Sequence, residues 1–409
     1  MHTIKPLSSE VRQYLIITAN YWAFTLTDGA LRMLVVLHFY QLGYSPLQIA
    51  MLFVFYEIFG VITNLVGGWL GAQLGLNKTM NIGLALQVIA LAMLLVPVSL
   101  LAIPWVMAAQ ALSGVAKDLN KMSAKSAIKL LVPASDQGTL YKWVALLTGS
   151  KNALKGAGFF LGGAMLTLFG FTGAIATMAV ALALVWIFSL TMLEKDLGKA
   201  KNKPPFSAIF SKSRTINFLS AARLFLFGAR DVWFVIALPV FLASQLGWDH
   251  WSISSFIGFW IIGYGIVQSI APIITRTRSG KLPDGKTALF WAFALAFIPA
   301  LIALALMNEF NPTWSLMTGL TVFGVLFAIN SSLHSYLIVS YANEDGVSLD
   351  IGFYYMANAL GRLIGTVLSG WLFQVAGLEA CLWVSSAFIA IAALMSLALP
   401  KHAPKAASA

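Results

Sequence analysis

Charged side chains inside long apolar segments are the residues of this chain best suited to do chemistry. An ionisable group at bilayer depth costs roughly 2.5 to 3.5 kcal/mol, so it usually faces a cavity and meets a partner or a ligand. Bases outnumber acids in these segments by eight to four. This surplus of positive charge indicates that the basic side chains bind an anion. The bases are Arg32, Lys117, Lys121, Lys151, Lys155, Arg223, Arg230 and Arg362, and the acids are Asp28, Glu57, Asp118 and Asp231.

Two arginines occupy related places in the two halves of the chain. Arg223, Phe227 and Arg230 share one helix face, because seven residues make almost two turns. Asp231 is the next residue, so it is expected to point elsewhere and to neutralise Arg230 only in part. Since a planar guanidinium binds phosphate or carboxylate through two hydrogen bonds, Arg32 and Arg230 can grip one ligand from both halves.

A stripe of lysines spaced by four runs along another predicted helix, at 117, 121, 125 and 129. Lys117 is deep enough in the segment to line a cavity, and Lys121 lies near its inner edge. Lys125 and Lys129 are expected to reach the cytoplasm as topological anchors.

Two further lysines, Lys151 and Lys155, are again four residues apart, and like charges at that spacing repel. A bound anion between them would relieve the repulsion, and pairing with Asp118 or Glu57 is the alternative. Arg362 is the counterpart of Lys155 in the second half. Together the basic side chains predict an anion pocket near the midplane, between two helical bundles.

The four acids admit two roles. A desolvated carboxylate titrates nearer neutrality, so Asp28 and Glu57 can carry protons if transport is proton-coupled. The alternative for each acid is an ion pair, and Asp28 can pair with Arg32 one turn away. His38 and His334 are alternative proton relays, or are hydrogen-bonded within the protein.

Composition identifies the class of protein. The chain is 59% hydrophobic and only 10% charged, against about 25% charged residues in a soluble domain. Long apolar runs predict an all-α, multi-pass membrane protein. The single cysteine excludes disulfides within the chain and thiolate metal sites, and no catalytic motif is present, so we expect no metal, no cofactor and no enzymatic activity.

Twelve transmembrane helices are predicted from the apolar runs and the polar or Gly/Pro breaks. A basic stretch divides them into an N-terminal six-helix bundle at 1–194, a cytoplasmic linker at 195–216 and a C-terminal bundle at 217–409. The predicted helices are 14–40, 47–71, 80–98, 104–124, 140–168, 173–193, 217–243, 251–275, 287–307, 314–341, 350–375 and 378–399.

Lysine and arginine outside the membrane favour one side. They gather at both termini, in the linker and around 276–286, and the opposite loops have none. Both termini are therefore predicted to be cytoplasmic. The net charge of +11 reflects this topology and the buried surplus, so it gives no support to nucleic-acid binding.

The two halves also resemble each other in sequence. Gln41-Leu42-Gly43 returns as Gln245-Leu246-Gly247, and the Asn-Ala-Leu at 152–154 returns at 358–360, with glycines following in step. Parallel six-helix repeats with a cytoplasmic linker are the arrangement of major facilitator transporters. The charged loop typical of that family after its second helix is degraded here, because residues 68–78 keep the glycines and lose most of the charges.

Three stretches carry a closer resemblance, which extends over nearly the whole chain. They are residues 20–33 (NYWAFTLTDGALRM), 117–129 (KDLNKMSAKSAIK) and 224–234 (LFLFGARDVWF). They resemble the ArsJ permeases. The resemblance implies export across the inner membrane of 1-arseno-3-phosphoglycerate, made from arsenate by a companion glyceraldehyde-3-phosphate dehydrogenase, and hence arsenate resistance. The charges by themselves indicate only a multivalent anion, which suits hard cationic donors.

The sequence thus predicts a monomeric transporter that works by alternating access. We expect Arg32, Lys117, Lys121, Lys151, Lys155, Arg230 and Arg362 to bind the anion. Import or exchange of another organic phosphate, or export of another organic anion, remains the alternative within transport. A receptor or a lipid-modifying enzyme is disfavoured, because the chain has neither a sizeable domain outside the membrane nor a catalytic motif.

Overall fold

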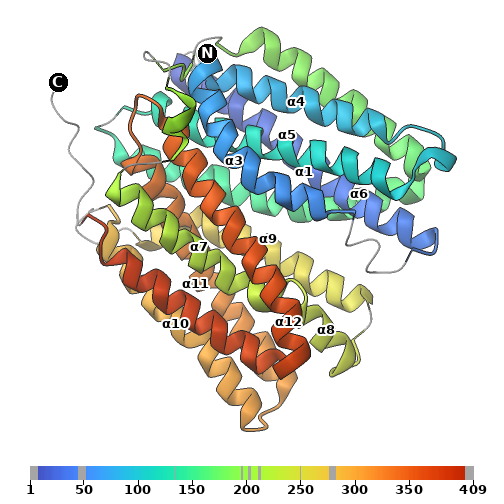
Figure 1. The fold of residues 1–409 in the computed structure, drawn as a ribbon, viewed down its shortest axis with the longest axis vertical. Coiled ribbons are helices and arrows are strands. Elements are labelled where there is room, and N and C mark those ends of the chain that lie inside the picture. Colours follow the sequence, from blue (N-terminus) through green and yellow to red (C-terminus); the bar gives the residue numbers. More distant parts are fainter. Residues whose placement is uncertain are drawn as a thin grey trace, which may run out of the picture. The chain divides into compact units, whose positions relative to one another are not determined.

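The computed structural model describes residues 8–44, 52–133, 135–194, 197–200, 204–210, 213–248, 250–275 and 282–400, and every long element in them is a helix (Figure 1). The predicted all-α class is confirmed. The helices are α1 (Ser9–Gln41), α3 (Val54–Leu74), α4 (Leu76–Met93), α5 (Ile103–Leu131), α6 (Gln137–Met192), α7 (Arg214–Phe234), α8 (Ala237–Ser244), α9 (His250–Thr275), α10 (Gly285–Met307), α11 (Pro312–Tyr341) and α12 (Val347–Ser396), with short 3-10 turns at Val98–Leu100 and Phe206–Ile209.

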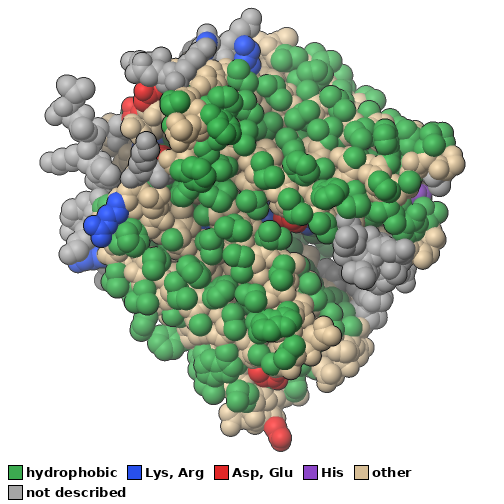
Figure 2. Space-filling view, in the orientation of Figure 1, with side chains coloured by type: hydrophobic (Ala, Val, Ile, Leu, Met, Phe, Trp, Pro, Cys, Tyr) green, Lys and Arg blue, Asp and Glu red, His purple; other side chains and the backbone are tan. Residues whose placement is uncertain are grey.

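Most of these helices are long and apolar enough to cross a membrane. Eight such spans lie in the described residues, with α7 and α8 counted as one. Helices α1 and α5 fall outside that set; they carry Asp28, Arg32 and the lysine stripe. Figure 2 shows apolar side chains over most of the visible face. Exposed Leu168, Ile273 and Trp314 suit contact with lipid rather than with water.

Several boundaries differ from those predicted. Helix α5 runs to Leu131, seven residues past the expected end, because its lysines are covered by protein. The helix predicted at 217–243 is broken at Val235 and Ile236 into α7 and α8. The helix predicted at 47–71 is described only from Val54 onward, as α3.

Two long helices are each bent at a single glycine. Gly170 in α6 has φ 66° and Gly377 in α12 has φ 76°, both in the left-handed region that favours glycine. The two positions are repeat counterparts, and each separates two predicted helices. Each long element therefore comprises two spans that meet at a glycine turn.

Replacing Gly170 or Gly377 by alanine is expected to destabilise the protein by about 1 to 2 kcal/mol, because a Cβ at positive φ meets the following carbonyl. Thermal unfolding of the purified protein in detergent measures the change. Gly263→Ala is the control, since no atom lies within 4 Å of its added Cβ and the residue is in the regular helix α9. Equal melting temperatures for Gly170→Ala and the wild type would contradict the strain.

The chain forms two compact units. Unit 1 comprises Met1–Trp143, Ala157–Phe210 and Asn343–Gly352, and unit 2 comprises Val144–Gly156, Ser211–Ala342 and Phe353–Ala409. In unit 1, α5 is central and packs against α1, α3 and α4. The first turn of α12 also belongs to this unit, where the Ser348 hydroxyl donates to the carbonyl of Gly68 on α3 at 2.7 Å.

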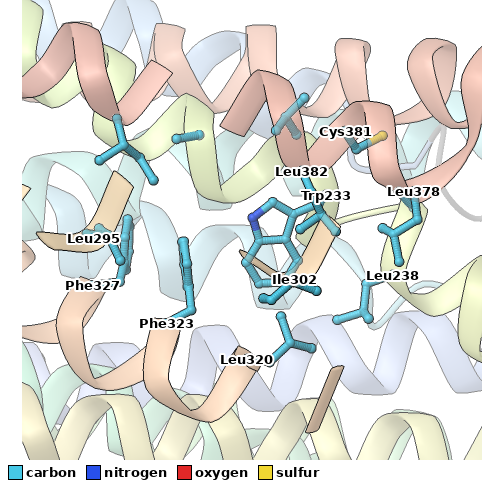
Figure 3. Close-up of a cluster of buried hydrophobic side chains, with 14 of the residues drawn as sticks. Trp233, Leu238, Leu295, Ile302, Leu320, Phe323, Phe327, Leu378, Cys381 and Leu382 are labelled. Carbon is cyan, nitrogen blue, oxygen red and sulfur yellow. The ribbon is translucent and has the colours of Figure 1, made fainter. Parts of the chain in front are cut away.

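In unit 2, α11 takes the same central position and packs against α7, α9 and α10. Its core is aromatic and aliphatic (Figure 3). The Trp233 ring meets Phe323 edge-on at 5.0 Å between centroids, and Phe323 stacks on Phe327 at 5.4 Å. These ring contacts hold the N-terminal half of α11 against α7. Helix α7 carries Arg223, Arg230 and Asp231.

Each half of the sequence contributes one segment to the compact unit that is formed mainly by the other half of the sequence. Residues 144–156 of α6 belong to unit 2, and residues 343–352, with the start of α12, belong to unit 1. The two exchanged segments occupy related places in the repeat. As a result, Lys151 and Lys155 lie in the same unit as Arg223, Arg230 and Arg362.

Candidate functional site

The buried charges are divided unequally between the two units. Unit 1 holds three bases and three acids, whereas unit 2 holds five bases and one acid. Among these twelve groups the surplus of four positive charges lies in unit 2, and the buried Lys125 and Lys129 of α5 add two bases to unit 1. The unit 1 set is Arg32, Lys117, Lys121, Asp28, Glu57 and Asp118, and the unit 2 set is Lys151, Lys155, Arg223, Arg230, Arg362 and Asp231.

In unit 1, the ion pair recorded for Arg32 is with Glu57 on α3, with 3.2 Å between Nη2 and Oε1. The expected pairing of Asp28 with Arg32 is thus replaced. Asp28 is buried and accepts hydrogen bonds from the Tyr56 hydroxyl, at 2.9 and 3.1 Å to its two oxygens. Because Tyr56 and Glu57 are neighbours on α3, both Asp28 and Arg32 of α1 have a partner on that helix.

Asp118 on α5 takes its partners from its own helix. Lys121 Nζ lies 2.5 Å from Oδ1 of Asp118, and Lys117 Nζ lies 3.9 Å from Oδ2. Lys117 also lies over the Tyr56 ring at 3.7 Å, which suits a cation–π contact. Asp118 is thus paired within its own helix, and the suggested pairing of Glu57 with Lys151 or Lys155 stays a prediction.

The last two lysines of the stripe, which were predicted to reach the cytoplasm, lie elsewhere in the structure. Lys125 and Lys129 are 3% and 9% exposed, so they are buried in protein rather than extended to a membrane surface. The reason is the central position of α5, which packs against α1, α3 and α4. Lys129 also lies within electrostatic range of Glu344, in the loop before α12.

In unit 2, one fully buried carboxylate serves two arginines. Arg230 places Nε and Nη2 at 2.6 and 2.5 Å from Oδ1 of Asp231, and Arg362 donates from Nε to Oδ2 at 3.1 Å. The expectation that Asp231 points away from Arg230 was wrong, because the long arginine side chain folds back onto its neighbour. The triad keeps one net positive charge. Its arginine side chains are 17% and 30% exposed.

Close backbone packing brings this triad together. Gly361 and Gly365 are four residues apart on α12, the spacing that lets helices approach in membranes. A Cβ at Gly365 would lie 2.6 Å from the carbonyl of Gly228, and one at Gly361 would overlap the carbonyl of Leu224. The two glycines therefore fix α12 against α7 at the level where Arg362 meets Asp231.

A polar chain links the α6 segment to the interior of unit 2. Lys151 Nζ donates to Oδ1 of Asn152 at 3.3 Å, and Asn152 Nδ2 donates to Gln268 on α9 at 2.6 Å. Gln268 Nε2 in turn donates to the hydroxyl of Ser331 on α11 at 3.0 Å. Lys155 lies one turn further along the same α6 segment.

Arg223 is the residue that the sequence-based set of ligands missed. It is 3% exposed and donates from Nε to Oδ1 of Asn358 at 2.8 Å and from Nη1 to the Ser331 carbonyl at 3.3 Å. Its guanidinium also lies over the rings of Phe227 at 3.8 Å and Tyr354 at 5.3 Å. All these partners are neutral. The available signal was the absence of an acid three or four residues to either side of it in α7.

Comparison with known families decides the class of the protein. A family model described as Major Facilitator Superfamily matches residues 15–346 and 254–409. The chain belongs to the major facilitator superfamily. The predicted fold, two helical bundles of that superfamily, is confirmed by this match and by the solved structures described next.

Solved structures with the same fold share little sequence with this major facilitator. A bacterial homologue of the iron transporter ferroportin, in an outward-facing state, has a TM-score of 0.74 at 13% identity, covering 96% of this chain and 99% of that one. The human organic anion transporter TETRAN has 0.73 at 14% identity, covering 95% and 100%. A proton:xylose symporter has 0.69 at 13% identity, covering 94% of each. No curated protein matches the sequence.

This major facilitator is therefore a multi-pass membrane transporter of small substrates. The likeness to the solved structures shows the fold alone. The class of substrate has to be inferred from the charged groups in the apolar segments. Those groups are cationic in excess, and the larger excess lies in unit 2.

Proposed function

We propose that this transporter exports the organic anion 1-arseno-3-phosphoglycerate from the cytoplasm and so confers arsenate resistance. The observation that carries the proposal is the unequal division of the twelve charged groups of the apolar segments, with five bases against one acid in unit 2. Arg230 and Arg362 both bind the carboxylate of Asp231, and an oxyanion is a chemically matching further ligand for two adjacent guanidinium groups.

The chemistry of the cargo suits these donors. Pentavalent arsenic in an oxyanion is bound through its oxygens, for which guanidinium and ammonium groups are the matching donors. The only cysteine, Cys381, is buried in the apolar core of unit 2. The identity of the cargo, and of glyceraldehyde-3-phosphate dehydrogenase as the enzyme that supplies it, rests on the resemblance to the ArsJ permeases.

The proposed mechanism is alternating access of two six-helix bundles, at 1–194 and 217–409, joined by the linker at 195–216. Lys121 attracts the anion, and Arg32, Lys117, Lys151, Lys155, Arg230 and Arg362 bind it. A membrane potential negative inside favours exit of an anion by about 2.3 kcal/mol per charge per 100 mV. Export therefore needs no coupled ion, and Asp28, Glu57, Asp118 and Asp231 serve as ion-pair partners or, if transport is coupled, as proton carriers.

The proposed orientation places both termini at the cytoplasmic face of the inner membrane. It rests on the distribution of Lys and Arg over the loops. Among the residues that carry it, Lys5, Lys195, Lys201, Lys203, Lys212, Arg276, Arg278, Lys281, Lys401 and Lys405 lie outside the described residues.

Inside-out membrane vesicles test the cargo. Arseno-phosphoglycerate labelled in its phosphate, and formed outside the vesicles by the dehydrogenase with arsenate, is expected to accumulate inside vesicles that contain the transporter. Vesicles without the protein are the control. Absence of accumulation with intact protein would overturn the proposed cargo. Accumulation of labelled 3-phosphoglycerate in its place would favour the alternative, a carrier of another organic phosphate.

A further inference from the structure

Two guanidinium groups flank one aromatic ring in unit 2. The Cζ atom of Arg223 lies 3.8 Å from the Phe227 ring centroid, and that of Arg230 lies 5.0 Å from it. The two cationic centres are therefore less than about 10 Å apart, close to the rise of seven helical residues. Helix α7 thus presents two positive charges on one face, separated by an apolar surface.

The two charges differ in how they are compensated. Arg230 has the carboxylate of Asp231, whereas the partners of Arg223 among the described residues are an amide oxygen, a carbonyl and two rings. A buried cation with neutral partners has lost its hydration without gaining a counter-charge. Within the described part of the chain, Arg223 therefore has no anionic partner at hydrogen-bond distance.

Further hydrogen-bond donors near Arg223 also have unused capacity. In the described residues, the hydroxyl of Tyr354 and both ring nitrogens of His334 are buried and make no hydrogen bond. The Tyr354 ring contacts Arg223, and His334 lies within electrostatic range of it, one turn after Ser331. A phenol, an imidazole and a guanidinium can all donate, and such a set recognises an anion.

We propose that unit 2 binds its cargo at two points, with one anionic end at Arg223 and Tyr354 and the other at Arg230 and Arg362. This inference rests on the proposed function and narrows its substrate class. The cargo carries negative oxyanion groups at both ends of a short chain of about three carbons, which lies along Phe227. Arg223 is thereby a binding residue and a determinant of specificity for two-ended anions.

The two ends of the proposed site differ in exposure. Arg223 is 3% exposed and contacts the rings of Phe227 and Tyr354, whereas the Arg230 and Arg362 side chains are 17% and 30% exposed. The more exposed pair is therefore expected to receive one end of the anion first.

Calorimetric titration of the purified full chain tests the two-point site with two stable probes. Propane-1,3-diphosphonate carries an anionic group at each end, and propylphosphonate is its one-ended match. We expect the wild type to bind the diphosphonate at least tenfold more tightly. Arg223→Gln is expected to abolish that preference and to leave affinity for propylphosphonate within twofold. Equal affinities in the wild type, or equal weakening of both probes by Arg223→Gln, would overturn the inference.

Two milder variants cover the case in which Arg223→Gln does not fold. Arg223→Lys keeps the charge and loses the planar fork, and Tyr354→Phe removes only the hydroxyl; each is expected to reduce the preference for the two-ended probe by about threefold or more. An unchanged preference in both would overturn the site. Failure of the cargo is distinguishable: a tenfold preference without arseno-phosphoglycerate flux refutes the cargo alone, and flux without the preference refutes the two-point site alone.

Discussion

Asp231→Asn is expected to destabilise the protein by about 3 to 5 kcal/mol. Asp231 is fully buried and its two oxygens bind Arg230 and Arg362, so removing its charge leaves two guanidinium groups with no counter-ion at that point. Thermal unfolding in detergent, read by size-exclusion chromatography after heating, measures the loss. Folded yield from membranes should fall in parallel.

A second substitution separates charge from packing in this prediction. The double variant Asp231→Asn, Arg362→Gln removes one of the two uncompensated cations, so it is expected to recover part of the lost stability. Glu309→Gln, at an exposed acid in the turn between α10 and α11, is the matched control and should leave stability unchanged. A melting temperature of Asp231→Asn equal to that of the control would show that the carboxylate charge is not needed.

Arg230→Gln is expected to reduce anion flux about 100-fold with the folded protein retained. A charge-assisted, two-pronged contact to an oxyanion contributes about 3 kcal/mol, and each 1.4 kcal/mol corresponds to a tenfold change in affinity. Asp231 then keeps Arg362 as its partner, so the fold should survive. Initial rates of uptake into inside-out vesicles, normalised to transporter content, provide the measurement.

Unit 1 supplies the comparison for that experiment. Lys117→Gln is also expected to lower flux, because Lys117 is 3.9 Å from Asp118, has a cation–π contact with Tyr56, and belongs to the proposed binding set. Its effect should be smaller than that of Arg230→Gln, since the larger excess of positive charge lies in unit 2. Unchanged flux in Arg230→Gln would return Arg230 to a purely structural role beside Asp231.

The helical architecture was predictable because it rests on local signals. Apolar runs, the glycines at 170 and 377 and the basic breaks are all visible in the sequence, and the two glycines do separate pairs of spans. The family also followed from the repeat. The end of α5 was not predictable in this way, because Lys125 and Lys129 look like surface anchors until neighbouring helices cover them.

The partners of the buried charges were harder to predict, because helical spacing reports only on contacts within one helix. Asp28 and Arg32 share a face, yet α3 supplies the hydrogen bond of one and the recorded ion pair of the other. Asp231 and Arg230 are adjacent in sequence and still bind each other, since arginine is long enough to fold back. Arg223 was passed over because its significance depends on neutral groups from α11 and α12.

The exchange of segments between the two units has a consequence for any attempt to divide the protein. Residues 144–156 belong to unit 2 although they precede the predicted linker at 195–216, and residues 343–352 belong to unit 1 although they follow it. Cutting the polypeptide in this linker would yield two fragments. The first fragment would lack residues 343–352 of unit 1, and the second would lack residues 144–156 of unit 2. The two predicted bundles are therefore not expected to fold as autonomous units when separated.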